Sequence, residues 1–132
     1  MICLDTSFLV DLLRNKKEAV KKIENLNSNN IATTRINIYE ILLGAFLRGQ
    51  KDQQKFSEKA KLILDRIEIL DFNETACINS ARINANLILN GREIESTDSM
   101  IAGTMIANGC DTIITQNKDH FERIKEIKVE GY

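Results

Sequence analysis

Short apolar runs that alternate with helix-like segments constrain the fold of this chain more than any other feature. The runs are Ile2–Leu4, Ile31–Thr33, Ile67–Leu70, Thr112–Thr115 and residues 127–129. Runs of this length fit buried strands and are too short for core helices. Buried strands that alternate with amphipathic helices are typical of α/β proteins, in which helices cover both faces of a parallel sheet. We therefore predict an α/β fold with a parallel sheet of about five strands.

Apolar residues recur at helical spacing between these runs. In residues 73–90, for example, Ala76, Ile83 and Leu87 fall on one helical face, and Gly91 is a suitable stop because glycine adopts the left-handed conformation readily. The other expected helices lie between the remaining runs, at residues 6–14, 16–26, 34–47, 52–66, 96–108 and 118–123.

Length and charge exclude several classes of protein. A chain of 132 residues fits one domain, here residues 1–132, with enough buried surface for a core. Its net charge of −1 gives no basic excess for neutralising many phosphates, so any nucleic-acid binding needs a metal ion or a local patch. No apolar run approaches the ~20 residues of a membrane helix, and the N-terminus lacks a signal-peptide core. We expect a cytoplasmic protein without membrane contact.

Cysteine and histidine usage excludes several metal sites. Cys3, Cys77 and Cys110 are far apart and form no Cys-x-x-Cys pair, which argues against a disulfide framework and against structural zinc. Each lies among apolar residues, so we expect all three to be buried as small hydrophobic side chains. His120 is the one histidine, so no site with two or three histidines can form.

Two polar residues lie just after predicted strands. Asp5 follows the first apolar run, and Asn117 follows the run at 112–115. In parallel sheets, functional sites form outside the carboxyl ends of the strands, so both residues are candidates for such a site. The structural alternatives are that Asp5 caps a helix or forms a turn and that Asn117 is an ordinary loop residue.

An acidic residue also interrupts the apolar face of a predicted helix. Glu40 has Ile36, Leu43 and Leu47 as its neighbours on that face. A buried carboxylate there needs a partner, a proton or a metal ion. The alternatives are that Glu40 completes a capping box begun by Asn37, or that it points outward.

Asp98 is a third acidic candidate, in the first turn of a strongly apolar helix. Acids in a first turn commonly complement the helix dipole, which is the structural alternative here. Together, Asp5, Glu40, Asp98 and Asn117 could converge at one edge of the sheet. Oxygen ligands without His or Cys favour hard cations such as Mg²⁺ or Mn²⁺. The three carboxylates would repel a phosphodiester until a cation binds among them.

Five short motifs follow one another along nearly the whole chain. They are an apolar run with Asp-Thr-Ser (Ile2–Ser7), Glu-Ile-Leu-Leu-Gly (Glu40–Gly44), Gly-x-x-Ile leading into Asp-Ser-Met-Ile-Ala-Gly (Gly91–Gly103), Thr-Gln-Asn-Lys-Asp-His-Phe (Thr115–Phe121) and Val-Glu-Gly-Tyr (Val129–Tyr132). In this order the motifs resemble those of the PIN-domain nucleases and, within them, the VapC-type toxins of toxin–antitoxin pairs.

The resemblance implies a PIN-like α/β sandwich over residues 1–132. It implies an endoribonuclease that depends on Mg²⁺ or Mn²⁺, hydrolyses RNA phosphodiester bonds and acts as a type II toxin, with a cognate antitoxin and a homodimeric assembly. The catalytic metal ligands that it implies are Asp5, Glu40, Asp98 and Asn117. Thr6 and Thr115 would orient these carboxylates. An amide at position 117 coordinates more weakly than a carboxylate, so the number of metal ions stays open.

Two other functions fit the same sequence. One is a housekeeping RNA-processing nuclease without an antitoxin, and the other is a catalytically silent PIN-like module that binds RNA or protein. His120 is either a general acid or a solvated loop residue. We expect the helices at 34–47 and 52–66 to pack in the core, with a groove for a second copy or an antitoxin as the alternative.

Overall fold

A five-stranded parallel sheet forms the centre of the computed structural model, which describes residues 1–27 and 30–132 and, within them, all side chains except those of Gln50 and Asp52. The strands are β1 (Ile2–Leu4), β2 (Ile31–Thr34), β3 (Glu68–Leu70), β4 (Thr112–Ile114) and β5 (Lys128–Glu130). Their order in the sheet is β3-β2-β1-β4-β5. All pairings between neighbours are parallel, as the alternation of strands and helices predicts.

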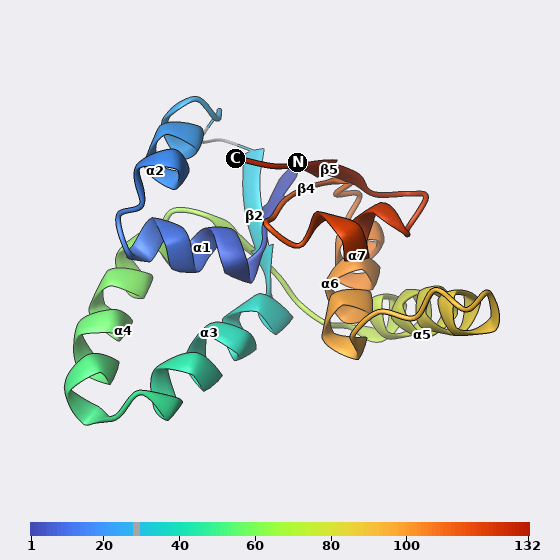
Figure 1. Cartoon of the computed structure of the whole chain (residues 1–132), viewed down its shortest axis with the longest axis horizontal. Coiled ribbons are helices and arrows are strands. Elements are labelled where there is room, and N and C mark those ends of the chain that lie inside the picture. The colour runs from blue at the N-terminus through green and yellow to red at the C-terminus, as the bar shows by residue number, and fades with distance from the viewer. Residues whose placement is uncertain (28–29) are drawn as a thin grey trace.

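Helices lie on both sides of the sheet (Figure 1). They are α1 (Thr6–Leu13), α2 (Lys17–Glu24), α3 (Arg35–Leu47), α4 (Gln50–Leu64), α5 (Glu74–Leu89), α6 (Ser96–Ala107) and α7 (Lys118–Glu122). Figure 1 shows α1 to α4 on one side of the sheet and α5 to α7 on the other. None of these described helices is long and apolar enough to span a membrane.

Successive residues of the central strands point to opposite faces of the sheet, so each face has its own core. Cys3 of β1 and Ile113 of β4 belong to the cluster that packs against α6 and α7. Leu4 and Ile114, the next residues along, belong to the cluster that packs against α1. This burial on both faces confirms the predicted α/β fold and explains why the strands are apolar without alternation.

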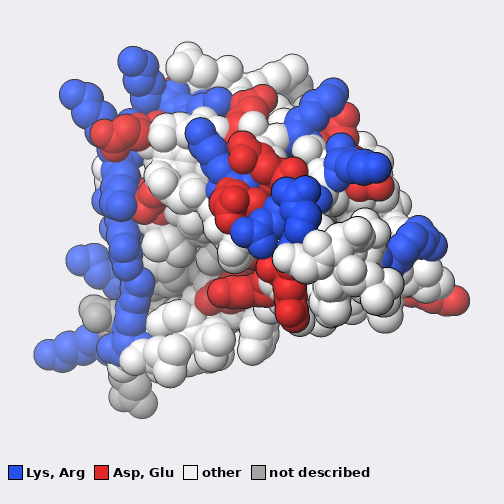
Figure 2. Space-filling model, turned by 45° about the vertical axis from the view of Figure 1, so that its right-hand side comes forward, with Lys and Arg blue, Asp and Glu red and all other residues white. Residues whose placement is uncertain are grey.

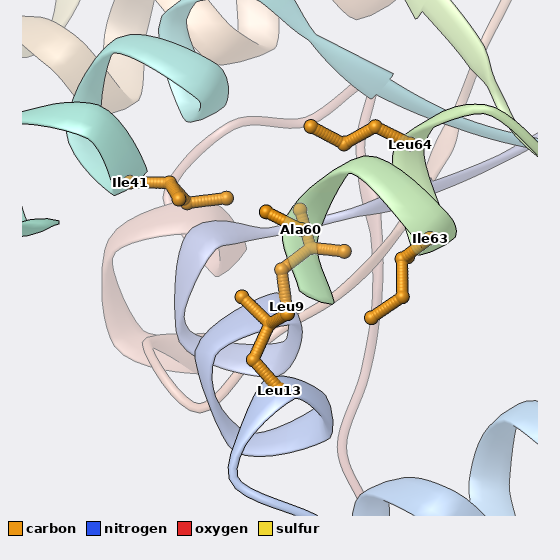
Figure 3. A pocket seen from close by; sticks show the side chains of 6 residues that line it. All are labelled: Leu9, Leu13, Ile41, Ala60, Ile63 and Leu64. Atoms are coloured by element: carbon orange, nitrogen blue, oxygen red, sulfur yellow. The ribbon is translucent and has the colours of Figure 1, made fainter. Parts of the chain in front are cut away.

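Helix α4 packs its apolar side chains against α1 and α3 (Figure 3). The side chains that meet there are Leu9, Leu13, Ile41, Ala60, Ile63 and Leu64. They leave no room for a water molecule between them. The contact is therefore a dry part of the core and not a ligand site.

The expectation that α3 packs in the core is confirmed for only part of the helix. Ile41 and Ala45 are buried, but Tyr39, Phe46 and Leu47 are 56%, 65% and 79% exposed. Periodicity marks an apolar face in the same way whether the core or a partner covers it, so the sequence could not separate the two cases.

The expectation that all three cysteines are buried is also wrong for one of them. Cys3 and Cys110 lie in the core, whereas Cys77 is exposed on α5. Cys77 is exposed because of its position on the helix. Ala76 and Ser80 occupy the buried face of α5, and Cys77 lies beside that face.

Candidate metal centre and active site

The predicted site residues lie at the edge of the sheet where the strands end. Asp5 follows β1, and Thr115 and Asn117 follow β4. Helix α3 begins directly after β2, which brings Glu40 on its second turn toward the same edge. Asp98 lies in the first turn of α6. Parallel pairing places the carboxyl ends of β1, β2 and β4 together, so the topology gathers these side chains.

Asp5 is buried and accepts hydrogen bonds from three side chains. Thr115 Oγ1 donates to its Oδ2 over 2.6 Å, Asn37 Nδ2 donates to its Oδ1 over 3.0 Å, and Ser7 Oγ donates to Oδ2 over 3.3 Å. Asp5 occupies the N-cap position of α1, yet its side chain makes no capping hydrogen bond. The helix-capping alternative is therefore wrong for this side chain.

Glu40 is half-buried and accepts a hydrogen bond over 2.7 Å from Thr6 Oγ1. Asn37 Nδ2 in turn donates to the same Thr6 hydroxyl over 3.0 Å. The capping box of α3 consists of Thr34 and Asn37, so the alternative that Glu40 completes a box begun by Asn37 is wrong. Glu40 instead lies between the core side of α3 and its exposed apolar face.

Asp98 contacts Asn117, in the loop after β4, and His120, in α7. Its Oδ2 lies 2.6 Å from His120 Nδ1 and 3.1 Å from Asn117 Nδ2. A separation of 2.6 Å requires a proton between the two atoms, so Asp98 and His120 share a hydrogen bond whose donor is set by the tautomer of the imidazole. Asp98 is only 6% exposed, which argues against a merely solvated first-turn acid.

One continuous hydrogen-bond network connects the four predicted ligands. Asn37 links Asp5 to Thr6 and so to Glu40. The Thr115 hydroxyl donates to Asp5 and accepts from the Asn117 backbone N–H over 2.8 Å. The Asn117 side chain then completes the path to Asp98. The expected orienting residues thus touch two of the carboxylates, Thr6 at Glu40 and Thr115 at Asp5.

All three carboxylates of the site have raised pKa values, mainly because they are buried. Burial raises the pKa of Asp5, although its Thr115, Ser7 and Asn37 donors oppose the change. Burial is also the main cause of the raised pKa values of Glu40 and Asp98. The negative charge of Asp5 raises both further, while Thr6 opposes the rise at Glu40 and His120 opposes it at Asp98. Negative charge is therefore concentrated where solvent screens it poorly.

This donor set fits a hard divalent cation. It offers carboxylate and amide oxygens, and a cation would relieve the mutual repulsion of the acids. Over residues 1–27 and 30–132, no three acidic, histidine or cysteine side chains already converge at ligand spacing. The carboxylates would therefore exchange some of their present hydrogen bonds for the cation when one binds.

Sequence reasoning missed two members of the network. Asn37 is fully buried and bridges Asp5 and Thr6, and Ser7 contacts both Asp5 and Thr115. The charge of Glu95 raises the pKa values of Glu40 and Asp98. Asn37 lies one turn before Glu40 on the same helix, and this spacing could have indicated it.

One face of the molecule carries acidic and basic side chains next to one another. Figure 2 shows Asp and Glu side chains beside Lys and Arg in the middle of the face in view, and a row of basic side chains along its left edge. An unbroken basic surface is therefore absent from the middle of that face. Attraction of a polyanion there depends on cations more than on the protein's own charge.

The chain is similar over nearly its whole length to characterised bacterial proteins. It is 29% identical over 129 residues to the tRNA(fMet)-specific endonuclease VapC of Salmonella typhimurium, an alignment that covers 98% of this chain and 96% of that protein. It is 28% identical over 131 residues to ribonuclease VapC2 of Rickettsia felis, covering 98% of this chain and 96% of that one.

Solved structures agree with this similarity. The fold superposes with a TM-score of 0.86 on the DNA-bound VapBC of Salmonella typhimurium, at 28% identity over 98% of this chain and 96% of the other. The TM-score is 0.87 against VapBC2 of Rickettsia felis bound to a DNA fragment from its promoter, at 26% identity over 100% of this chain and 99% of the other. The sequence profile of the PIN domain matches residues 2–127. The chain therefore belongs to the PIN domain family.

Proposed function

We propose that this protein is a Mg²⁺- or Mn²⁺-dependent endoribonuclease that hydrolyses RNA phosphodiester bonds as the toxin of a type II toxin–antitoxin pair. The observation that carries the proposal is the network joining Asp5, Glu40, Asp98 and Asn117 at the edge of the sheet. Partly buried carboxylates with raised pKa values lower the stability of a metal-free fold, so a cluster of them points to a function. The endonuclease and ribonuclease names of its relatives support the same reaction.

Asp5, Glu40 and Asp98 would hold the cation, together with the amide oxygen of Asn117. When bound, a divalent cation neutralises charge on the phosphate oxygens and makes a water molecule easier to deprotonate. Without it, the acids repel a phosphodiester.

The other residues of the network position the acids. Thr115 and Asn37 fix the Asp5 carboxylate, and Thr6 fixes Glu40. His120 Nδ1 lies within hydrogen-bond distance of one oxygen of Asp98 and helps to position this carboxylate.

The proposed partners are an antitoxin protein and a second copy of the chain, and the proposed location is the cytoplasm. The similar structures from Salmonella typhimurium and Rickettsia felis are VapBC and VapBC2 bound to DNA, and the resemblance of this chain to VapC-type toxins implies a cognate antitoxin. On this chain, the exposed apolar side chains of α3 give such a partner a surface to cover. An amphipathic segment of the antitoxin would pack against them.

Cleavage of a mixed RNA panel tests the reaction. Purified protein free of antitoxin is incubated with Mn²⁺, with Mg²⁺ and with EDTA, beside Asp98→Asn and the control Asp111→Asn. Asp111 precedes β4 and so lies at the opposite edge of the sheet. We expect metal-dependent cleavage by the wild type and Asp111→Asn, and a loss of at least about 100-fold in Asp98→Asn.

Three outcomes would contradict the proposal. Cleavage that survives EDTA or the Asp98→Asn change would show that the reaction does not use the metal centre. Folded protein that binds RNA but cleaves none of the panel would favour the silent binding module. Cleavage without any associated antitoxin in the native host would favour the housekeeping nuclease.

A further inference from the structure

A row of lysines lies on the outer face of α4. Lys51, Lys55 and Lys59 recur at every fourth residue, so they share one face of the helix and follow one another about 6 Å apart along its axis. All three are exposed, whereas Phe56 and Ile63 of the same helix pack against the core. The row therefore faces solvent over ~12 Å of helix.

Helix α2 carries a second pair of exposed lysines with the same spacing. Lys17 and Lys21 lie four residues apart, and Ala19 is on the buried side of this helix. Both α2 and α4 pack against the core cluster at α1, and Figure 1 shows them on the same side of the molecule. In Figure 2, basic side chains follow one another along the left edge, which belongs to that side. We call these five lysines the basic track: Lys17, Lys21, Lys51, Lys55 and Lys59.

The lysines of the basic track form no ion pair with any described side chain. Elsewhere on the surface, Lys16, Lys22 and Lys128 each pair with a neighbouring acid. Residues 48–66 contain six basic and three acidic residues in a chain whose net charge is −1, so positive charge is concentrated in this segment. Like charges at this spacing repel one another, and a bound polyanion would relieve the repulsion.

The chemistry of the basic track fits the phosphate backbone of a nucleic acid. Each lysine is a compact point charge that offers donors only, which suits it to bind phosphate but not to read a base sequence. A length of ~12 Å corresponds to three or four nucleotides at the ~3.4 Å spacing of a helical strand. A continuous row of cations matches a polymer with one charge on every unit better than an acidic protein segment, in which uncharged residues interrupt the charges.

The basic track lies within reach of an RNA strand held at the acids. Helix α3 covers about 10 Å from Glu40 to its last residue, Leu47. Lys51 follows four residues later, which adds about 14 Å when the chain is fully extended. The near end of the track is therefore within about 25 Å of Glu40, a distance that about seven nucleotides span. The track would thus contact the strand that flanks the cleaved bond and not the bond itself.

We propose that the basic track binds the phosphate backbone of the RNA substrate on one side of the cleaved bond, an inference that rests on the proposed ribonuclease function. It is the local patch that a chain without basic excess needs for binding RNA. In the metal-free protein the acids repel RNA, while the track attracts it whether or not a cation is bound. The substrate is then an RNA long enough to reach from the acids to α4.

Binding of RNA without metal separates the basic track from the cation site. The protein is titrated in EDTA against a fluorescein-labelled single-stranded RNA of about 30 nucleotides and mixed sequence, at several salt concentrations. The double variant Lys55→Gln/Lys59→Gln should bind about tenfold more weakly at about 50 mM salt, and the slope of log affinity against log salt should fall by about 1.4. Lys61→Gln/Lys125→Gln is the matched control, since it removes the same charge from exposed lysines outside the track. Its affinity should stay within about twofold of the wild type.

Cleavage provides a second readout. With Mn²⁺ and an RNA that the wild type cleaves, Lys55→Gln/Lys59→Gln should raise KM about tenfold and leave kcat unchanged, because the track holds the substrate away from the reacting bond. A KM equal to that of the wild type would overturn the proposal, as would a loss confined to kcat.

The binding experiment separates this proposal from the proposed function. Equal weakening in the two double variants would show that overall charge attracts RNA, and would overturn the basic track. Absence of RNA binding by the wild type in EDTA would overturn it too, while metal-dependent cleavage by the same protein would leave the nuclease standing. The expected pattern of RNA binding in a protein that cleaves no RNA would support the track and contradict the nuclease. Lost antitoxin affinity with unchanged RNA affinity would assign the track to a protein partner and overturn its role in RNA binding.

Discussion

At the scale of single residues, the direction of a pKa shift separates the proposed site from ordinary surface acids. Hydrogen bonds to Thr112 and Lys128 and the nearby lysine charge lower the pKa of Asp111, as expected for a paired surface carboxylate. The pKa of Asp98 rises instead, because burial and the charge of Asp5 outweigh the His120 hydrogen bond. A carboxylate in that position lowers the stability of the metal-free fold and so points to a function.

Asp98→Asn should therefore raise the stability of the metal-free protein. A raised folded-state pKa means that the folded chain binds protons more tightly than the unfolded chain, so this contribution to stability falls as the pH rises through the acidic range. The advantage of Asp98→Asn over the wild type should grow from pH 4 toward pH 7, measured by denaturant unfolding in EDTA. A wild type that is the more stable of the two at pH 7 would contradict this.

Thr115→Val tests whether the hydroxyl orients Asp5. Valine keeps the shape of threonine but cannot donate to the carboxylate, so the affinity for Mn²⁺ should fall by about 10- to 100-fold. Thr112→Val is the control, because its hydroxyl donates to Asp111 at the other end of β4. Equal affinities in calorimetry for Thr115→Val and the wild type would remove this role.

At the scale of elements, the close contact of α5 with α6 fixes the position of the Asp98 turn. A Cβ atom on Gly103 of α6 would collide with Ser80 of α5, lying 2.5 Å from its backbone nitrogen and 2.8 Å from its Cα. The Ser80 hydroxyl also donates to the carbonyl of Ala76 over 2.6 Å, so its side chain is held in place. Glycine is therefore required for the spacing of these helices.

Gly103→Ala should lower the free energy of unfolding by about 1–3 kcal/mol, since backbone must move to relieve the overlap. Gly44→Ala is the matched control within α3, where an added Cβ meets nothing within 4 Å. It should be neutral or stabilise the protein by up to about 1 kcal/mol, because alanine favours helix over glycine. Similar denaturation midpoints for the two variants would show that the helices can shift without cost.

At the scale of the whole molecule, the sequence predicts the architecture better than it predicts which surfaces are covered. Runs such as Ile2–Leu4 and Thr112–Thr115 identify the central strands, because a parallel sheet covered on both faces needs continuous apolar residues. Because Asp5 directly follows the first of these runs, the sequence also places it at the carboxyl ends of the strands, where the proposed site lies. The buried bridge formed by Asn37 could not be read from the sequence, since it depends on β1 and β2 lying side by side.

The sequence likewise could not predict that Phe46 and Leu47 are exposed, because an apolar helix face can be covered either by the core or by a partner protein. Phe46→Asp should leave the fold intact, because this side chain is 65% exposed, yet weaken binding of the cognate antitoxin at least about tenfold. Leu89→Asp is the control, an equally apolar residue that is 86% exposed on α5. Light scattering and calorimetry of the mixed proteins measure the effect. If Phe46→Asp binds the antitoxin as tightly as the wild type does, the antitoxin binds a surface other than α3.

The proposed function requires that the acids at the end of β1, on the second turn of α3 and in the first turn of α6 hold a divalent cation. Calorimetric titration of Mn²⁺ into the metal-free protein tests it most directly, with Asp98→Asn and Asp111→Asn beside the wild type. We expect saturable binding to the wild type and Asp111→Asn, and binding weakened at least about tenfold in Asp98→Asn. No binding to the folded wild type, or the same affinity in all three proteins, would contradict it.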